Sequence, residues 1–192
     1  MTQAGGRRRG PPGEVRLIGG QWKRSKLPVA DRPGLRPTPD RVRETLFNWL
    51  GQDLTGWRVL DAFAGTGALG FEAASRGASE VLMLERDATL VRALIEVKTR
   101  LKANAVQALS ADALAWLKRC APGRFELVFL DPAFDADVFD AALAAAAPSV
   151  APGGFIYLEA PRAFAAAPDG FELHRHLRAG AVHAHLFARI DV

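Results

Sequence analysis

The stretch that decides the fold is Val59-Leu-Asp-Ala-Phe-Ala-Gly-Thr-Gly-Ala-Leu-Gly70, a short apolar run that leads into three glycines at the spacing G-x-G-x-x-G. A strand that enters a glycine-rich turn and then a helix is typical of α/β folds that bind nucleotide-like ligands. The spacing alone is weak evidence. A nicotinamide dinucleotide site has the same glycines and an acidic residue at the end of the next strand, which is the position of Glu85.

Asp61 argues against the dinucleotide site. It places a carboxylate between the strand and the first glycine, near the position that two phosphate charges would occupy. Like charges a few ångströms apart at a partly buried site cost on the order of kcal/mol. A carboxylate there suits a ligand with a cationic amino acid and a sulfonium, namely S-adenosylmethionine. An oxidoreductase is thus a third alternative function, after the two named at the end of this section, and it would require tight nicotinamide binding.

Outward from this loop, short apolar runs alternate with longer stretches of helical periodicity. Apolar strands separated by helices predict a parallel sheet that is covered on both faces. After residue 170, apolar residues alternate with polar ones on either side of Gly180, which predicts an antiparallel hairpin that closes the sheet. The predicted strands are 58–60, 81–84, 105–109, 125–130 and 155–158, and the predicted helices are 67–76, 87–103, 112–119 and 136–147.

Acidic residues end successive predicted strands, where an open α/β sheet has its ligand crevice. We expect Glu85 to accept hydrogen bonds from both ribose hydroxyls of the donor and Asp112 to accept one from the adenine amino group. The backbone N–H of Ala113 would donate to the adenine ring. For Asp61 and Asp112, a simple role at the start of a helix is the alternative. The other residues expected at the donor site are Ala62, Phe63, Gly65, Thr66, Gly67 and Arg86.

The run Phe125-Glu-Leu-Val-Phe-Leu-Asp-Pro-Ala-Phe134 predicts a buried strand with a catalytic end. An exocyclic base amine is a poor nucleophile, because its lone pair is delocalised into the ring. Hydrogen bonds from that amine to the Asp131 side chain and the Pro132 carbonyl would aim the lone pair at a methyl group, and such positioning lowers a barrier by several kcal/mol. Phe134 would stack on a flipped base. The alternative is a strand-ending turn followed by a core phenylalanine.

Composition and charge limit the class of protein. The chain has 192 residues, of which 49% are hydrophobic and 24% charged, so one domain with a full core is expected. No apolar run is long enough to span a membrane and no signal peptide is recognisable, so we expect a cytoplasmic protein. The net charge of +4 divides into +7 for residues 1–50 and −3 for the rest, which favours a basic region that faces nucleic acid.

The chain is predicted to divide into three parts. We expect residues 1–13 to be a disordered basic tail, residues 14–35 a basic hairpin arm, and residues 36–192 the methyltransferase domain. The hairpin is predicted to have two short strands around a Gly19-Gly20 turn. The next helix is predicted to use Thr38 as its N-cap and Pro39 as its first residue, with Asp40 near the positive end of its dipole and Val42, Leu46, Trp49 and Leu50 on its buried face. The residues proposed to contact RNA or the donor carboxylate are Lys23, Arg24, Arg36, Thr38 and Arg41.

Cysteine and histidine do not form a recognisable metal motif. Cys120 is the one cysteine, so no intrachain disulfide is possible. The pairs His174 with His176 and His183 with His185 are interpreted as exposed strand residues, since no carboxylate or cysteine cluster joins them. We therefore expect no metal.

With these residues in place, the sequence resembles the RsmD-type bacterial 16S rRNA (guanine(966)-N(2))-methyltransferases over about residues 15–190. The segments that carry the resemblance are Arg36-Pro-Thr, Asp40-Arg-Val-Arg-Glu-Thr-Leu-Phe-Asn-Trp-Leu50 and Leu60–Gly70. The family implies a Rossmann-like class I α/β fold with a seven-stranded, mostly parallel sheet and an antiparallel C-terminal strand. It also implies an N-terminal hairpin that grips RNA, S-adenosylmethionine as donor, and 16S rRNA or a small-subunit assembly intermediate as partner. We expect a monomer.

Ala133 departs from the family pattern, which usually has a second proline in Asp-Pro-Pro-Phe. The departure concerns loop rigidity more than reaction type. Two alternatives to the family's function stay open. One is an N6-adenine DNA methyltransferase, which would use the same amine-positioning residues, although no separate target-recognition domain is visible. The other is a non-catalytic RNA-binding assembly protein.

Overall fold

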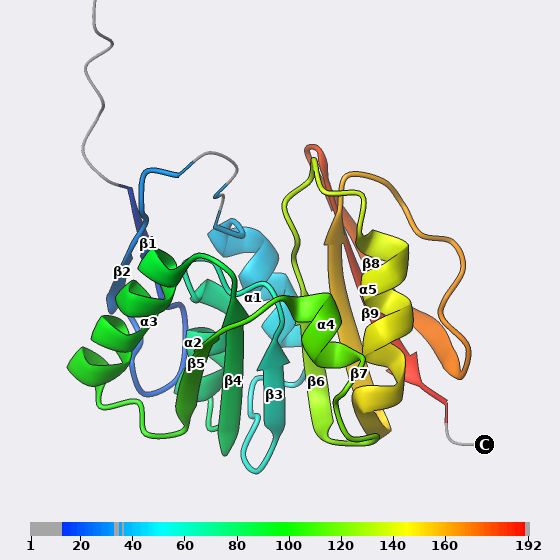
Figure 1. Ribbon diagram of the computed structural model, residues 1–192, viewed down its shortest axis with the longest axis horizontal. Coiled ribbons are helices and arrows are strands. Elements are labelled where there is room, and N and C mark those ends of the chain that lie inside the picture. The colour runs from blue at the N-terminus through cyan, green and yellow to red at the C-terminus, as the bar shows by residue number, and fades with distance from the viewer. Residues whose placement is uncertain (1–12, 33–34, 36, 191–192) are drawn as a thin grey trace, which may run out of the picture.

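The computed structural model describes residues 13–32, 35 and 37–190 (Figure 1). Its centre is a sheet of seven strands: β3 (Arg58–Asp61), β4 (Glu80–Glu85), β5 (Val106–Ser110), β6 (Phe125–Leu130), β7 (Val150–Ala160), β8 (Phe171–Ala179) and β9 (Val182–Arg189). The spatial order is β5-β4-β3-β6-β7-β9-β8. Strand β9 is antiparallel to both of its neighbours, while the strands from β5 to β7 pair in parallel. The predicted seven-stranded sheet with an antiparallel C-terminal strand is confirmed.

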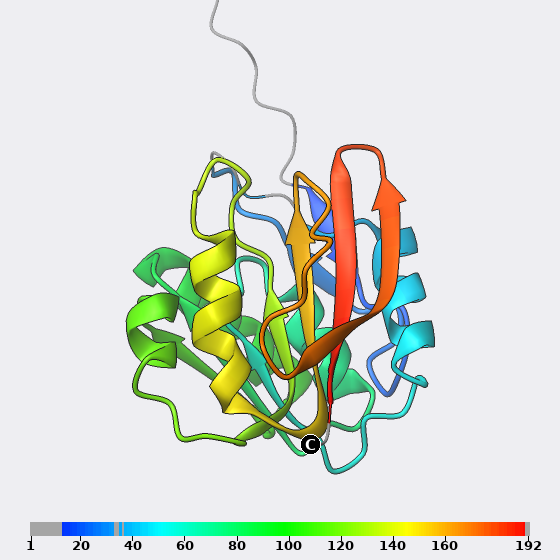
Figure 2. The same cartoon turned by 90° about the vertical axis from the view of Figure 1, so that its right-hand side faces the viewer.

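Helices cover both faces of this sheet. They are α1 (Asp40–Trp49), α2 (Ala68–Ser75), α3 (Ala88–Leu101), α4 (Ala113–Leu117) and α5 (Phe139–Ala146), followed by a single 3-10 turn, η1 (Ala147–Ser149). Successive strand side chains point to opposite faces. Val59 and Val81 therefore join a core with α1, α2 and α3, whereas Leu60 and Leu82 join a second core with α4 and α5. Figure 2 shows α1 and α5 on opposite sides of the strands. None of the helices in the described residues is long and apolar enough to cross a membrane.

Strand β7 is longer than predicted. The sequence favours 155–158, and the strand begins at Val150. The missed half contains Ala151-Pro-Gly-Gly154, which has the composition of a turn. This half pairs irregularly, because the register of β7 against β6 shifts between Phe125 and Leu127. The other predicted strands and helices lie within a few residues of their expected ends.

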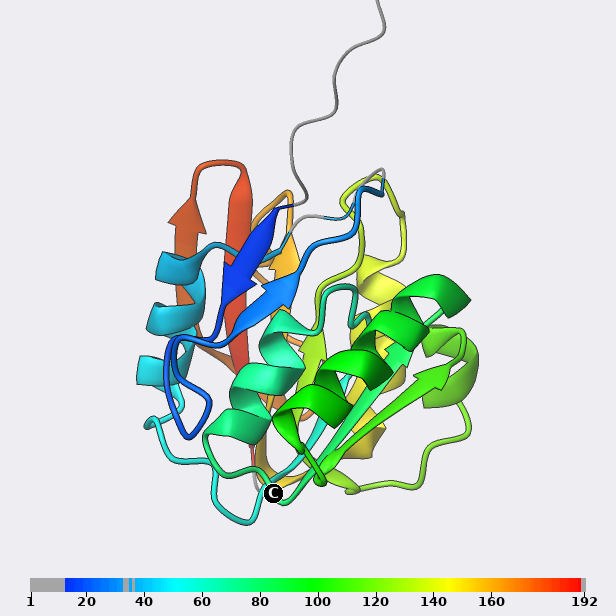
Figure 3. The same cartoon turned by 90° about the vertical axis from the view of Figure 1, so that its left-hand side faces the viewer.

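The N-terminal hairpin consists of β1 (Glu14–Arg16) and β2 (Lys26–Pro28), which pair antiparallel. The hairpin is confirmed, but the predicted tight turn at Gly19-Gly20 is wrong, since residues 17–25 form a longer connecting loop. Val15 and Leu27 are buried in the same core as α1 and α2. Figure 3 shows the hairpin beside α1 on the outer side of that core.

The two glycines serve contact with α2 rather than a turn. Gly20 has φ +72°, and a Cβ on it would lie 1.9 Å from the backbone oxygen of Ser75. The Gln21 N–H donates to that oxygen at 2.8 Å, and the Ser75 hydroxyl donates to the Gly19 oxygen at 2.6 Å. Glycine is needed because the loop backbone lies directly on the end of the helix.

Helix α1 begins one residue later than predicted. Pro39 occupies the N-cap and makes no side-chain capping bond, so the N-cap prediction for Thr38 is wrong. The Thr38 hydroxyl instead donates to Asp131, 93 residues away. The predicted face is buried at Val42, Leu46 and Leu50, whereas Trp49 is only half-buried.

Candidate active site

A cavity of about 970 Å³ lies at the carboxyl ends of β3, β4, β6 and β7. A cavity of this size is typical of small-molecule and cofactor sites. Its walls include most of the predicted donor-site and catalytic residues: Asp61, Ala62, Phe63, Gly65, Thr66, Glu85, Arg86, Asp112, Ala113, Asp131, Pro132 and Phe134. The topology brings them together, because the ends of parallel strands meet at one edge of the sheet.

Asp61 is fully buried at the end of β3, where its Oδ2 accepts a hydrogen bond from the Gly70 N–H at 3.0 Å. Gly70 lies in the first turn of α2, and a Cβ there would stand 2.6 Å from the Met83 side chain. A carboxylate therefore accepts from an N–H group at the start of α2, where a pyrophosphate would bind. This geometry weighs against dinucleotide binding, as the sequence predicts.

Burial is the main reason that the pKa of Asp61 rises to about 7. The hydrogen bond from Gly70 lowers it, the negative charge of Glu85 raises it, and a hydrogen bond from the Phe63 backbone lowers it. The backbone N–H groups of Gly70 and Phe63 thus stabilise the Asp61 carboxylate, whereas its burial away from water destabilises it. A cationic ligand nearby would favour that form.

Glu85 braces the glycine loop from the next strand. Its Oε2 accepts from the Gly65 N–H at 3.0 Å, and its Oε1 accepts from the Asp87 N–H at 2.8 Å. Each carboxylate oxygen has two lone pairs, so both can accept one further hydroxyl. The side chain is half-buried and lines the cavity. The position suits the predicted ribose contact, which stays a prediction.

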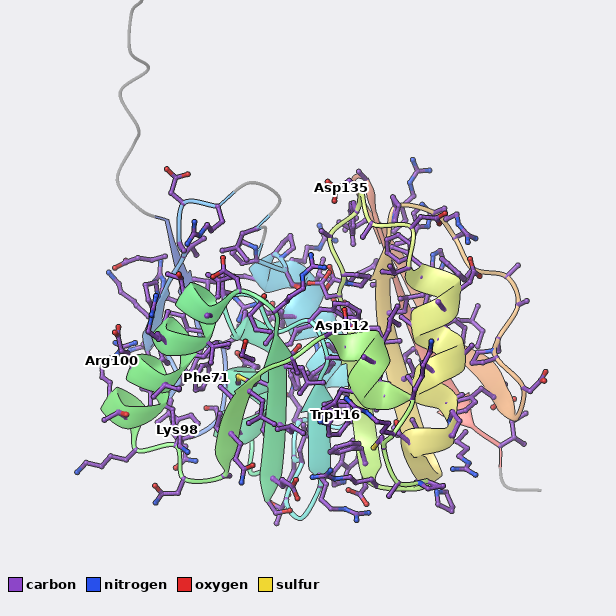
Figure 4. The ribbon with its side chains drawn as sticks, in the orientation of Figure 1. Phe71, Lys98, Arg100, Asp112, Trp116 and Asp135 are labelled. Atoms are coloured by element: carbon purple, nitrogen blue, oxygen red, sulfur yellow. The ribbon has the colours of Figure 1, made fainter. Side chains whose placement is uncertain are left out.

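Asp112 is the N-cap of α4, where its Oδ1 accepts from the Ala115 N–H at 2.8 Å. The helix-start role considered for this residue is therefore real. Asp112 also lies on the cavity wall with Ala113, so the capping bond leaves its second oxygen for a ligand. Figure 4 shows Asp112 at the start of α4 and Asp135 in the loop after β6, at the same end of the sheet.

Asp131 directly follows β6 and faces the cavity. Its Oδ2 accepts from the Thr38 hydroxyl at 3.3 Å. Burial raises the pKa of Asp131 well above its usual range, the charges of Glu159 and Asp61 raise it further, and the Thr38 hydrogen bond lowers it.

Pro132 is buried, Ala133 is exposed and Phe134 is half-buried, and all three line the cavity. The Ala133 carbonyl accepts from the Ala136 N–H at 3.0 Å, so the loop closes into a turn without a second proline. The positions of Asp131, Pro132 and Phe134 at the cavity suit the predicted roles in holding an amine and stacking on a base.

Sequence reasoning missed Glu159, which is the penultimate residue of β7 and lines the same cavity at 3% exposure. The Tyr157 hydroxyl donates to its Oε1 at 2.9 Å. A signal was available. The apolar run Phe155–Leu158 ends in an acidic residue, as the strands before Asp61 and Glu85 do. The shortened prediction for β7 concealed the resemblance of this strand end to the others.

The second omission is a buried ion pair between Arg43 and Glu72, both fully buried, with Nη1 and Oε2 3.3 Å apart. Arg43 also donates through Nε to the Thr38 carbonyl at 3.1 Å. Glu72 accepts from the backbone N–H groups of Ile18 and Gly19, both at 2.8 Å. One carboxylate therefore joins the hairpin loop to α1. The charge of Arg43, part of the basic N-terminal count, is used inside the protein.

The residues predicted to contact substrate are dispersed. Thr38 lines the cavity. Lys23, Arg24 and Arg41 are exposed and do not line it, and Arg36 lies outside the described residues. Gly67, predicted at the donor site, is the N-cap of α2 with φ +78° and is not part of the cavity wall.

The prediction of four exposed histidines holds fully only for His176. His174 and His183 are half-buried, and His185 is fully buried. The rings of His176 and His183 are stacked 5.3 Å apart. The Nε2 of His185 accepts from the Phe164 N–H at 3.0 Å, and burial lowers the pKa of His185 to about 4. Within the described part of the chain, no group of three or more His, Cys, Asp or Glu residues is arranged to hold a metal ion.

Known proteins resemble the chain over nearly its whole length. Ribosomal RNA small subunit methyltransferase D of Escherichia coli (strain K12) is 39% identical over 181 residues, which cover 92% of this chain and 91% of that protein. The protein of the same name from Haemophilus influenzae is 43% identical over 152 residues, covering 77% of this chain and 79% of the relative.

Solved structures agree with this. That of yhhF from Escherichia coli, a candidate methyltransferase, has a TM-score of 0.82 and 38% identity, and the match covers 94% of this chain and all of that one. The predicted methyltransferase fold is confirmed. The family described as "Conserved hypothetical protein 95" matches residues 15–188, and the chain belongs to this family.

Proposed function

We propose that this protein transfers a methyl group from S-adenosylmethionine to the exocyclic N2 amine of a guanine in 16S ribosomal RNA, at the position that the family resemblance implies, guanine 966. It would act in the cytoplasm as a monomer on the RNA or on an assembly intermediate of the small subunit. The names of the relatives, ribosomal RNA small subunit methyltransferase D, support the substrate class.

The observation that carries the proposal is the position of Asp131-Pro132 in one cavity with Asp61 and Glu85. An amine bound at Asp131 and a donor bound along the glycine loop would meet in that space. The clustered carboxylates favour a cationic ligand over a pyrophosphate, since burial and mutual repulsion raise the pKa values of Asp61 and Asp131.

The residues present fit S-adenosylmethionine. Glu85 has free lone pairs for two ribose hydroxyls, and Asp112 and Ala113 have the acceptor and donor that an adenine edge requires. The donor would supply an electrophilic methyl group on a sulfonium. The protein would supply orientation: the Asp131 carboxylate and the Pro132 carbonyl hold the amine, and Phe134 stacks on the base.

Exposed basic side chains support RNA as the partner. Lys23 and Arg24 lie on the hairpin loop and Arg41 on α1, all exposed to solvent. The hairpin and α1 pack against one core, so the backbone segments that carry these basic residues are held together. Phosphate contacts of this kind position a nucleic acid without reading its sequence.

The test is mass spectrometry of 16S rRNA from cells that lack the protein, with wild-type and Asp131→Ala genes returned on plasmids. We expect one N2-methylguanosine to disappear, to return with the wild type and to stay absent with the variant. Unchanged N2-methylguanosine in the deletion strain would refute the proposal. Methylation of DNA but not rRNA by purified protein would favour the adenine methyltransferase, and an absence of donor binding in calorimetry would favour a non-catalytic assembly protein.

A further inference from the structure

Three oxygen-bearing side chains that line the cavity lie near one another, namely those of Thr38, Asp131 and Glu159. Strand β6 pairs with β7 so that Leu130 opposes Leu158. The next residues, Asp131 just after β6 and Glu159 near the end of β7, therefore lie side by side. The Thr38 hydroxyl donates to Asp131 Oδ2 at 3.3 Å, and it lies close enough to the Glu159 side chain to lower the pKa of that acid. One hydroxyl therefore lies beside two carboxyl groups.

The proposed reaction releases a proton that needs an acceptor. The amine lone pair forms the new N–C bond, and the C–S bond breaks with its electrons on sulfur, which becomes a neutral thioether. The amine nitrogen then carries a positive charge until an N–H bond breaks and leaves its electrons on nitrogen. Asp131 is the carboxylate proposed to hold that amine, so it is placed to take the proton. It must lose this proton before it can serve another substrate.

We propose that Glu159 receives this proton from Asp131 through the hydroxyl of Thr38. Once Asp131 is protonated, the Thr38 hydroxyl no longer donates to it and turns its own proton toward Glu159. The hydroxyl oxygen then accepts the proton of Asp131 while its own proton moves to Glu159, so Thr38 is unchanged afterwards and Asp131 is again a carboxylate. Glu159 lines the cavity and loses the proton to solvent when the products leave. This inference rests on the proposed amine methylation. It gives a buried acidic residue, which the proposed donor and base contacts leave unused, a defined part in the reaction.

The surroundings of Glu159 suit a side chain that can be either a carboxylate or a neutral carboxylic acid. Arg43 on α1 and the hydroxyl of Tyr157 stabilise its carboxylate, and so does Thr38, whereas burial favours its protonated form. Asp131, just after β6, is the neighbouring acid, and the negative charge of Asp61 in turn raises the pKa of Asp131.

The test measures single-turnover methyl transfer to 16S rRNA as a function of pH, at saturating donor, for Glu159→Gln and Thr38→Val. We expect both variants to lower the plateau rate about tenfold, within the range attributed to proton transfer by side chains. In Glu159→Gln the acid limb should also move to lower pH, because Asp131 loses a neighbouring negative charge. Thr45→Val is the matched control, since the Thr45 hydroxyl bonds only the Arg41 carbonyl of the same helix.

Two further variants separate proton transfer from structural support. Thr38→Ser keeps a hydroxyl and should recover most of the plateau that Thr38→Val loses. The double variant Thr38→Val/Glu159→Gln should be no slower than either single variant, because both interrupt one path. If Glu159→Gln does not fold, Thr38→Val and Thr38→Ser still decide the question.

A wild-type plateau in either Glu159→Gln or Thr38→Val would overturn the inference, as would a Thr38→Ser rate as low as that of Thr38→Val. The proposed function fails differently, because the wild-type protein would then transfer no methyl group to rRNA at any pH.

Discussion

Replacing Arg43 by methionine should lower the free energy of unfolding by about 3 kcal/mol, which is at the lower end of the range for breaking a buried ion pair by removing one partner. The side chain is 0% exposed and donates to three groups, namely Glu72, Asp40 and the Thr38 carbonyl. The cost stays at the lower end because Glu72 keeps Arg76 and two backbone N–H donors. Methionine matches the length of the arginine stem, so cavity formation adds little.

The assay is urea denaturation at neutral pH, with Arg58→Met as the matched control. Arg58 pairs with Glu126 at 2.6 Å, but its side chain is 41% exposed, so its loss should cost less than about 1 kcal/mol. Equal costs for the two variants would refute the reasoning, because burial is what distinguishes the two pairs.

A double variant, Arg43→Met/Glu72→Met, extends the same test. An isolated buried ion pair can often be replaced by apolar residues with little loss of stability. Here the loss should exceed that of Arg43→Met alone, because the N–H groups of Ile18 and Gly19 would lose their acceptor at about 1–3 kcal/mol each. Hydrogen exchange at these two amides should accelerate only in the double variant.

Three further predictions concern pH, backbone and RNA. The Asp61 carboxyl keeps its proton up to about pH 7 in the folded protein but only up to about pH 3.8 in the unfolded chain. As the pH rises from about 3.8 to about 7, this residue therefore lowers the free energy of unfolding by about 1.4 kcal/mol per pH unit. Asp61→Asn should remove this contribution when urea denaturation is measured as a function of pH. Gly20→Ala should cost about 2 kcal/mol or more in thermal unfolding, against about 1 for Gly180→Ala, which also has positive φ but no neighbouring atom within 4 Å. Lys23→Ala/Arg24→Ala should weaken RNA binding and reduce the slope of log affinity against log salt by about 1 to 2, whereas donor affinity should not change with salt.

The sequence was sufficient for the sheet because its signals are local. Strand β6 (Phe125–Leu130) is apolar except at Glu126 and was predicted with its observed ends. The acidic residues Asp61, Glu85 and Asp131 each follow such a run, and the topology of a parallel sheet brings strand ends together. The alternation of strand and helix patterns, together with the acidic residues at the strand ends, was therefore enough to predict where the cavity lies.

The contacts of Thr38 and Arg43 could not be predicted in the same way. A threonine before Pro39 and Asp40 has every local feature of an N-cap, yet its hydroxyl bonds Asp131 across the site. An arginine within a basic segment has every local feature of a surface residue, yet Arg43 is buried and forms an ion pair with the buried Glu72. In both cases a partner distant in sequence decides the outcome, and local propensity carries no information about it.

These two residues also revise the meaning of the charge division. Part of the positive charge of residues 1–50 is neutralised internally, since Arg43 pairs with Glu72, while the carboxyl groups of Asp61, Asp131 and Glu159 gather at the cavity with raised pKa values. Arg43 touches both regions: it holds Glu72, which fixes the hairpin loop, and the Thr38 carbonyl, whose residue bonds Asp131. A proposed RNA-facing surface and a proposed catalytic carboxylate are therefore joined through one buried guanidinium. Because burial and mutual repulsion keep the three acids reluctant to ionise together, a cationic donor would promote their ionisation as it binds, and so prepare Asp131 to accept from the amine.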